Sequence, residues 1–108
     1  MTVMEDELSR VFAALADPTR RAILERLAQG EATVNELAEP FAITQQAVSR
    51  HVKVLEHAGL VSRSRSAQSR PCALEAARLD DAVGWIERHR ATWTERHDRL
   101  AHYLKEQQ

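Results

Sequence analysis

Residues 44–59 read TQQAVSRHVKVLEHAG, a pattern that predicts a helix with two chemically different faces. Thr44 is a favoured N-cap and Gly59 a common terminator, so the helix should run to about Ala58. The broad face expected to pack inward contains Ala47, Val48, His51, Val52, Val54, Leu55 and Ala58. The opposite face contains, at i, i+3, i+4 and i+7, the polar residues Gln46, Ser49, Arg50 and Lys53.

A shorter helix is expected immediately before this one. Thr33 and Glu36 have the spacing of a capping box, and Pro40 should help to end the helix that they begin. Its apolar residues are Val34, Leu37 and Ala38. Two short helices joined by a tight turn form a helix-turn-helix.

Two more helices are expected upstream. Asp17 followed by Pro18 is a strong helix start, because Asp caps well and Pro suits the first helical position; Gly30 should end this helix. A first helix is indicated by the i, i+3, i+4, i+7 spacing of Leu8, Val11, Phe12 and Leu15.

Downstream of Gly59 the periodicity changes. Residues 60–65 and 70–75 are compatible with two strands around a four-residue loop, which predicts a β-hairpin. A long helical pattern then covers residues 79–106. The expected fold class is therefore mainly α, a winged helix-turn-helix of five helices and a two-stranded wing, in a single domain over residues 1–108.

The polar face of the helix over residues 44–58 has the chemistry of DNA recognition. Gln pairs with adenine edges, Arg with guanine, Ser is permissive, and Lys supplies charge for phosphates. Thr44 and Gln45 join this set because the first turn of a recognition helix usually enters the major groove. A solvated polar face is the alternative, but no acidic residue interrupts it before Glu56.

The distribution of charge supports a nucleic-acid partner although the net charge is only −1. Residues 1–42 carry four Arg and eight Asp or Glu, whereas residues 43–78 carry six Lys or Arg and two Glu. Part of this basic segment is the hairpin, with Arg63, Arg65 and Arg70. These arginines could contact phosphates or a minor groove, or they could be a charged edge that discourages strand aggregation.

The last helix has an apolar stripe too long for so small a domain to cover. An uncovered stripe of this kind usually meets a second copy of the chain. We therefore predict a homodimer that pairs through residues 79–108, with help from the first helix. The residues expected at the interface are Leu8, Phe12, Leu79, Val83, Ile86, Trp93, Leu100 and Leu104.

Composition and motifs argue against several other classes of protein: disulfide-bonded or zinc proteins, membrane or secreted proteins, and enzymes. The single cysteine, Cys72, excludes an internal disulfide and paired-cysteine zinc sites, and we expect it to be an inert small residue. No apolar run approaches the ~20 residues of a membrane span, and residues 1–10 lack the pattern of a signal peptide, so we expect a cytoplasmic location. No catalytic motif or cofactor site is visible, so we expect neither an enzyme nor a cofactor.

Three segments resemble the ArsR family of winged-helix repressors: FAALADPTRRAIL at residues 12–24, VNELA at 34–38 and SRHVKVLEHAGLV at 49–61. The resemblance covers residues 8–75. It implies a homodimer that pairs through its first and last helices and binds double-stranded operator DNA. The effector is not indicated, and a winged helix that binds protein instead of DNA stays open as an alternative.

The chain departs from the metal-sensing members of that family. They have a Cys-x-Cys pair in the helix before the recognition helix, where this chain has Val34 to Ala38. The spacing of the last-helix histidines also differs from theirs. Asp98, His102 and Glu106 recur every four residues, so a metal-responsive repressor is a second alternative, but we expect no metal site.

Overall fold

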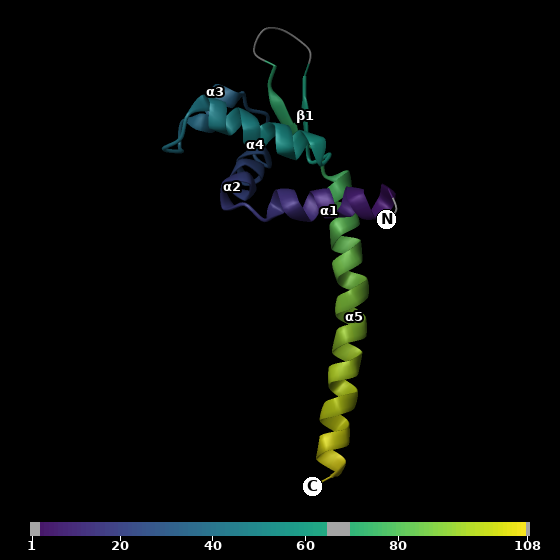
Figure 1. Ribbon diagram of the computed structural model, residues 1–108. Helices are drawn as coiled ribbons and strands as arrows, with labels where there is room; N and C mark the ends of the chain where they lie inside the picture. The colour runs from purple at the N-terminus through teal and green to yellow at the C-terminus, as the bar shows by residue number, and fades with distance from the viewer. Residues whose placement is uncertain (1–2, 65–69, 108) are drawn as a thin grey trace.

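The structure, a computed structural model, describes residues 3–64 and 70–107 (Figure 1). Within these residues the chain forms five helices and one two-stranded antiparallel sheet, which confirms the expected fold class. The elements are α1 (Val3–Leu15), α2 (Pro18–Leu27), α3 (Val34–Ala38), α4 (Gln45–His57), β1 (Val61–Arg63), β2 (Cys72–Leu74) and α5 (Ala77–Glu106).

The three predicted N-caps are present. The Asp17 carboxylate accepts hydrogen bonds from the backbone N–H groups of Thr19 at 2.8 Å and Arg20 at 3.2 Å. In the capping box, the Glu36 N–H donates to Thr33 Oγ1 at 3.2 Å and the Thr33 N–H donates to Glu36 Oε1 at 3.0 Å. Thr44 caps α4 by accepting from the Ala47 N–H at 3.1 Å. These bonds satisfy backbone donors that a helix start leaves without partners.

The hydrophobic core lies among α1–α4 and the hairpin. Helix α4 buries Val48, Val52 and Leu55 completely. The prediction that Val54 packs inward is wrong, because its side chain is 41% exposed. Successive side chains point about 100° apart around the helix axis, so Val54 points well away from the buried Leu55.

The predicted hairpin is present, although its strands β1 and β2 are shorter than residues 60–65 and 70–75. They pair antiparallel with Val61 opposite Leu74 and Arg63 opposite Cys72. Backbone hydrogen bonds of 2.9 Å from the Ser64 N–H to the Pro71 carbonyl and from the Glu75 N–H to the Leu60 carbonyl continue this pairing by one residue at each end. The expected loop over residues 66–69 and the preceding Arg65 lie outside the described residues. Strand β2 also pairs with Ala32 before α3, through hydrogen bonds of 3.1 Å and 2.7 Å with Cys72. This pairing, which the sequence did not predict, attaches the wing to the helix-turn-helix.

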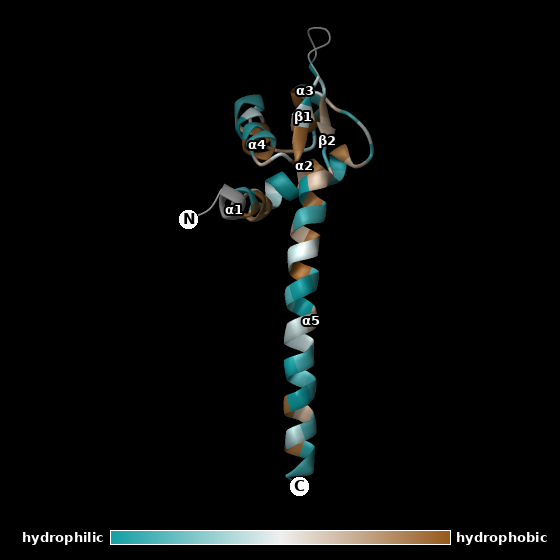
Figure 2. Cartoon of the chain, turned by 90° about the vertical axis from the view of Figure 1, so that its right-hand side faces the viewer, coloured by the Kyte–Doolittle hydropathy of each residue, from teal (hydrophilic) through white to brown (hydrophobic). Residues whose placement is uncertain are grey.

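Helix α5 projects away from the rest of the chain, on the side opposite the hairpin (Figures 1 and 2). The radius of gyration is 19.0 Å, against about 13 Å for a compact domain of this length. Only Ala82 of this helix is buried. Near its start, α5 packs on α1, where the rings of Phe12 and Trp85 meet edge to face at 5.7 Å.

None of the helices in the described part of the chain is both long enough and apolar enough to cross a membrane.

Candidate nucleic-acid interface

The exposed face of α4 is the central feature of the candidate interface. Gln46, Arg50 and Lys53 are exposed on the side opposite the buried Val48 and Leu55. Thr44 and Gln45 are also exposed at the start of the helix, while Ser49 is half-buried at the edge of this face. The predicted residues of α4 thus share one surface that can present amide, hydroxyl, guanidinium and ammonium groups to a ligand.

Arg20 links α4 to the first two helices. Its Nε and Nη2 donate to the carbonyl oxygens of Ala14 at 2.8 Å and Ala13 at 3.0 Å, at the end of α1. Its Nη1 lies 3.4 Å from Nδ1 of His51 on the flank of α4. Arg20 therefore satisfies carbonyl groups at the end of α1 and also helps to orient α4. No local pattern in the sequence predicts this role, because it depends on how α1, α2 and α4 pack.

A shallow groove of about 410 Å³ lies between α1 and α4 beside Lys53, and its wall is almost entirely apolar. Its floor is formed by Ala13, Val54 and Ala58, and its rim includes Lys53. Two further side chains on the rim, Arg10 and His57, were not predicted as site residues. His57 continues the spacing of Arg50 and Lys53 by four residues, so periodicity could have identified it. Only the packing of α1 on α4 brings Arg10 to the same place.

The arginines of the hairpin differ in accessibility. Arg70 is exposed, with a left-handed backbone φ of 41°. Arg63 is half-buried, and its Nε is buried with no hydrogen-bond partner. Opposite it, burial raises the pKa of the Cys72 thiol, and the Arg63 charge offsets part of that rise. Arg70 is therefore free to reach a phosphate, whereas Arg63 is partly occupied by contacts within the hairpin.

The histidine-rich end of α5 was the alternative metal site. His102 Nε2 lies 3.0 Å from Glu106 Oε1. Across residues 3–64 and 70–107, no three side chains among His, Cys, Asp and Glu gather closely enough to hold a metal ion. In this protomer, Asp98 does not complete such a group.

Helix α4 packs against α3, and the β1–β2 hairpin follows α4 directly in the chain. This arrangement defines a winged helix-turn-helix protein. Residues 15–63 match a family model described as a helix-turn-helix domain. The chain is 35% identical to the transcriptional repressor SdpR of Bacillus subtilis (strain 168) over 79 residues, which cover 73% of this chain and 88% of SdpR.

Two solved structures extend the comparison. A crystal structure of an ArsR family transcriptional regulator superposes with a TM-score of 0.76 at 38% identity, covering 82% of this chain and 97% of the other. The homodimeric winged helix-turn-helix DNA-binding domain of Mb0332 from Mycobacterium bovis, a possible ArsR-family regulator, gives a TM-score of 0.64 at 27% identity over 85% and 82% of the chains. The chain belongs to the ArsR family of transcriptional regulators.

Proposed function

We propose that this chain represses transcription as a homodimer that reads double-stranded DNA with the exposed face of α4. The observation that carries the proposal is the polar row Gln46, Arg50 and Lys53, which has no carboxylate among its members and projects opposite the core. Thr44, Gln45 and Ser49 border the row and complete the surface that would enter the major groove.

In this proposal the hairpin and the groove between α1 and α4 hold the DNA backbone. Arg70 has the exposure that a phosphate contact needs. Arg10 and His57 would add contacts beside Lys53. Arg63 would contribute less, because part of its guanidinium is buried, and Arg65 is included on its sequence position alone. Such contacts give affinity without reading sequence.

The homodimer would form through α5 and α1. Large apolar side chains along α5 are exposed, among them Ile86 at 45%, Trp93 at 63% and Leu100 at 55%. Val83 and Leu104 are exposed on the same helix, whereas Leu8, Phe12 and Leu79 already pack partly against this chain's own core. The homodimeric state of the Mb0332 domain supports this arrangement.

Repression follows if the dimer occupies a promoter. SdpR, which aligns with this chain over 88% of its length, is a transcriptional repressor. A twofold dimer presents two equivalent recognition helices, so the operator should be an inverted repeat with half-sites about 34 Å apart or a multiple of that. The protein would act in the cytoplasm, where bacterial DNA is transcribed.

The decisive experiment measures binding to DNA from the region upstream of the gene and to a scrambled duplex of equal length and composition. Fluorescence anisotropy at fixed salt should give at least a thousandfold preference for the operator, the low end of the range for specific regulators. A DNase footprint should then show two symmetric half-sites. Equal affinity for both duplexes would contradict the proposal and favour the protein-binding alternative.

A further inference from the structure

Helix α4 ends in a turn that only a few backbone conformations allow. Gly59 has a φ of +79°, and the Leu60 N–H donates to the Leu55 carbonyl at 2.9 Å while the Gly59 N–H donates to Glu56 at 3.0 Å. This left-handed C-terminal turn is one that glycine adopts readily. It sets the direction in which the chain leaves α4 and enters the wing.

Arg78, in the first turn of α5, packs directly on this turn. A Cβ atom built on Gly59 would lie 2.9 Å from Cγ of Arg78, closer than side chains tolerate, and 3.4 Å from its Nε, at the edge of ordinary contact. The aliphatic stem of Arg78 therefore covers the one face of Gly59 on which only a hydrogen atom fits.

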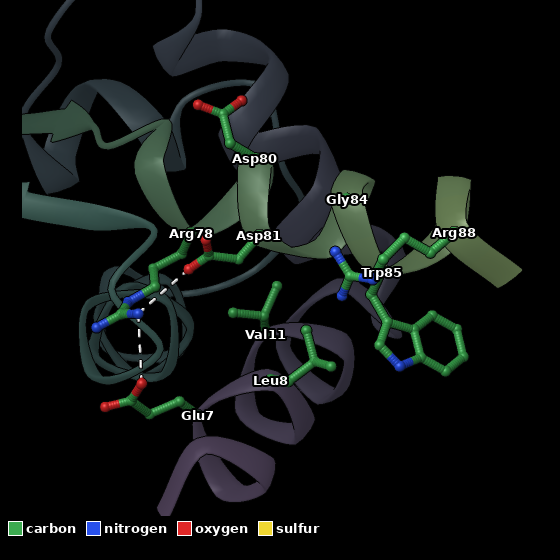
Figure 3. Close-up of a pocket in the computed structure, with 9 residues that line it drawn as sticks. All are labelled: Glu7, Leu8, Val11, Arg78, Asp80, Asp81, Gly84, Trp85 and Arg88. Carbon is green, nitrogen blue, oxygen red and sulfur yellow. Dashed lines mark hydrogen bonds and ion pairs between the residues drawn. The ribbon is translucent and has the colours of Figure 1, made fainter.

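The same side chain reaches two more elements. Nη1 of Arg78 lies 3.3 Å from Glu7 Oε2 on α1 and 3.2 Å from Asp81 Oδ2 on its own helix (Figure 3). A cavity of about 100 Å³ at this junction is bordered by Glu7, His57 and Arg78. Arg78, on α5, thus contacts both Glu7 of α1 and Gly59 at the end of α4.

The geometry points to Arg78 as a positioning residue that fixes the C-terminal end of α4 relative to α1 and α5. This inference rests on the proposed function, in which α4 reads DNA and α1 and α5 pair the two copies. A dimer can match two half-sites only if each α4 is held rigidly to the helices that pair. Arg78 supplies such a connection without contacting DNA itself.

Its effect should appear in binding and not in stability. The side chains of Arg78 and Glu7 are 42% and 40% exposed, and ion pairs so open to solvent add little to the free energy of unfolding. Coupling through one side chain typically changes an affinity by about two- to thirtyfold. We therefore expect Arg78→Gln to weaken operator binding by about three- to tenfold, with an unchanged melting temperature.

The first test compares Arg78→Gln and Arg78→Lys with wild type by anisotropy and sedimentation. Arg78→Lys, which keeps the charge and most of the stem, should recover part of the lost affinity. The dimer constant and the slope of log affinity against log salt should not change. The matched control is Arg88→Gln, which should bind as wild type does. Arg88 is an exposed arginine of the same helix that lines, together with Arg78, a second pocket between α1 and α5 (Figure 3), but it does not lie on Gly59.

A second test uses Gly59→Asn, because asparagine tolerates left-handed φ and isolates the contact from backbone strain. The loss of operator affinity caused by Gly59→Asn should be smaller in an Arg78→Ala background, where the clash is absent. Losses of affinity that simply add in the double variant would overturn the inference. So would any of three results for Arg78→Gln: unchanged operator binding, a salt slope lower by about one phosphate contact, or a weakened dimer. A wild type with no preference for the operator would instead refute the proposed function.

Discussion

Gln46 and Arg50 lie one helical turn apart and are both exposed on α4. If each makes a bidentate contact with a base edge, its replacement by alanine should cost about 1–3 kcal/mol of operator binding. Binding to scrambled DNA should hardly change, so the operator-to-random ratio should fall. The measurement is anisotropy on both duplexes.

The matched control is Gln29→Ala, since Gln29 is an exposed glutamine that follows α2. An operator-to-random ratio that survives both Gln46→Ala and Arg50→Ala would show that another surface reads the bases.

Asp17 gives a second prediction at the residue scale. The hydrogen bond from the backbone N–H of Arg20, helped by that of Thr19, holds the pKa of Asp17 below its ordinary value of 3.8. A carboxylate with a lowered folded-state pKa stabilises the fold fully above its unfolded-state pKa. That stabilisation is lost as the pH falls through the folded-state pKa.

Asp17→Asn keeps a capping side chain but removes this titration. The urea midpoint of the variant should therefore fall less steeply than that of wild type between about pH 5 and about pH 2. Asp98→Asn, on the exposed part of α5, is the control and should follow wild type. If the urea midpoints of Asp17→Asn and wild type fall equally steeply with decreasing pH, the prediction is refuted.

At the scale of elements, Lys53 of α4, Arg70 of the hairpin and Arg10 of α1 should respond to mutation differently from Gln46 and Arg50, which we propose read the bases. Lys53→Ala, Arg70→Ala and Arg10→Gln should weaken binding to operator and scrambled DNA by similar factors. Each variant should reduce the slope of log affinity against log salt by about 0.9, the value for one lost phosphate contact. Salt titrations on both duplexes measure this.

Arg99→Gln is the control for this series, because Arg99 is exposed on α5 and paired with Glu95. A different outcome is that Arg10→Gln leaves the salt slope unchanged while Lys53→Ala lowers it. In that case the groove between α1 and α4 does not contact the DNA backbone, and the interface is limited to α4 and the wing.

For the whole molecule, the elongated shape itself leads to a prediction. Helix α5 extends about 45 Å, and most of its large apolar side chains are exposed. Burying one Leu or Trp side chain contributes about 1.5–3 kcal/mol, so several on each protomer should give a stable dimer at micromolar concentration. Leu100→Glu should shift the protein toward monomer and weaken operator binding with it.

The control for dimerisation is Ala91→Glu, which adds the same charge to an exposed position on the opposite face of α5. Sedimentation should find this variant dimeric. A wild type that is monomeric at micromolar concentration would remove the basis for an inverted-repeat operator.

Interactions between residues close in the chain were predictable because their geometry is local. Asp17 caps α2 through residues two and three positions away, Thr33 and Glu36 cap one another, and Thr44 caps through Ala47. The periodicity of residues 44–58 likewise separates Val48 from Arg50 without reference to any other element. The starts of α2, α3 and α4 and the exposed row of α4 could therefore be predicted from the sequence alone, whereas the start of α1 at Val3 and of α5 at Ala77 could not.

Contacts between distant segments were decided by the tertiary structure. Ala32 pairs with Cys72, Arg20 reaches His51, and Arg78 covers Gly59 while it reaches Glu7. Long, flexible side chains can adopt many conformations, and their partners depend on how helices pack. No local spacing encodes that packing. The sequence by itself thus determined the elements and the chemistry on each face, whereas packing alone decided which side chains hold α4 in place.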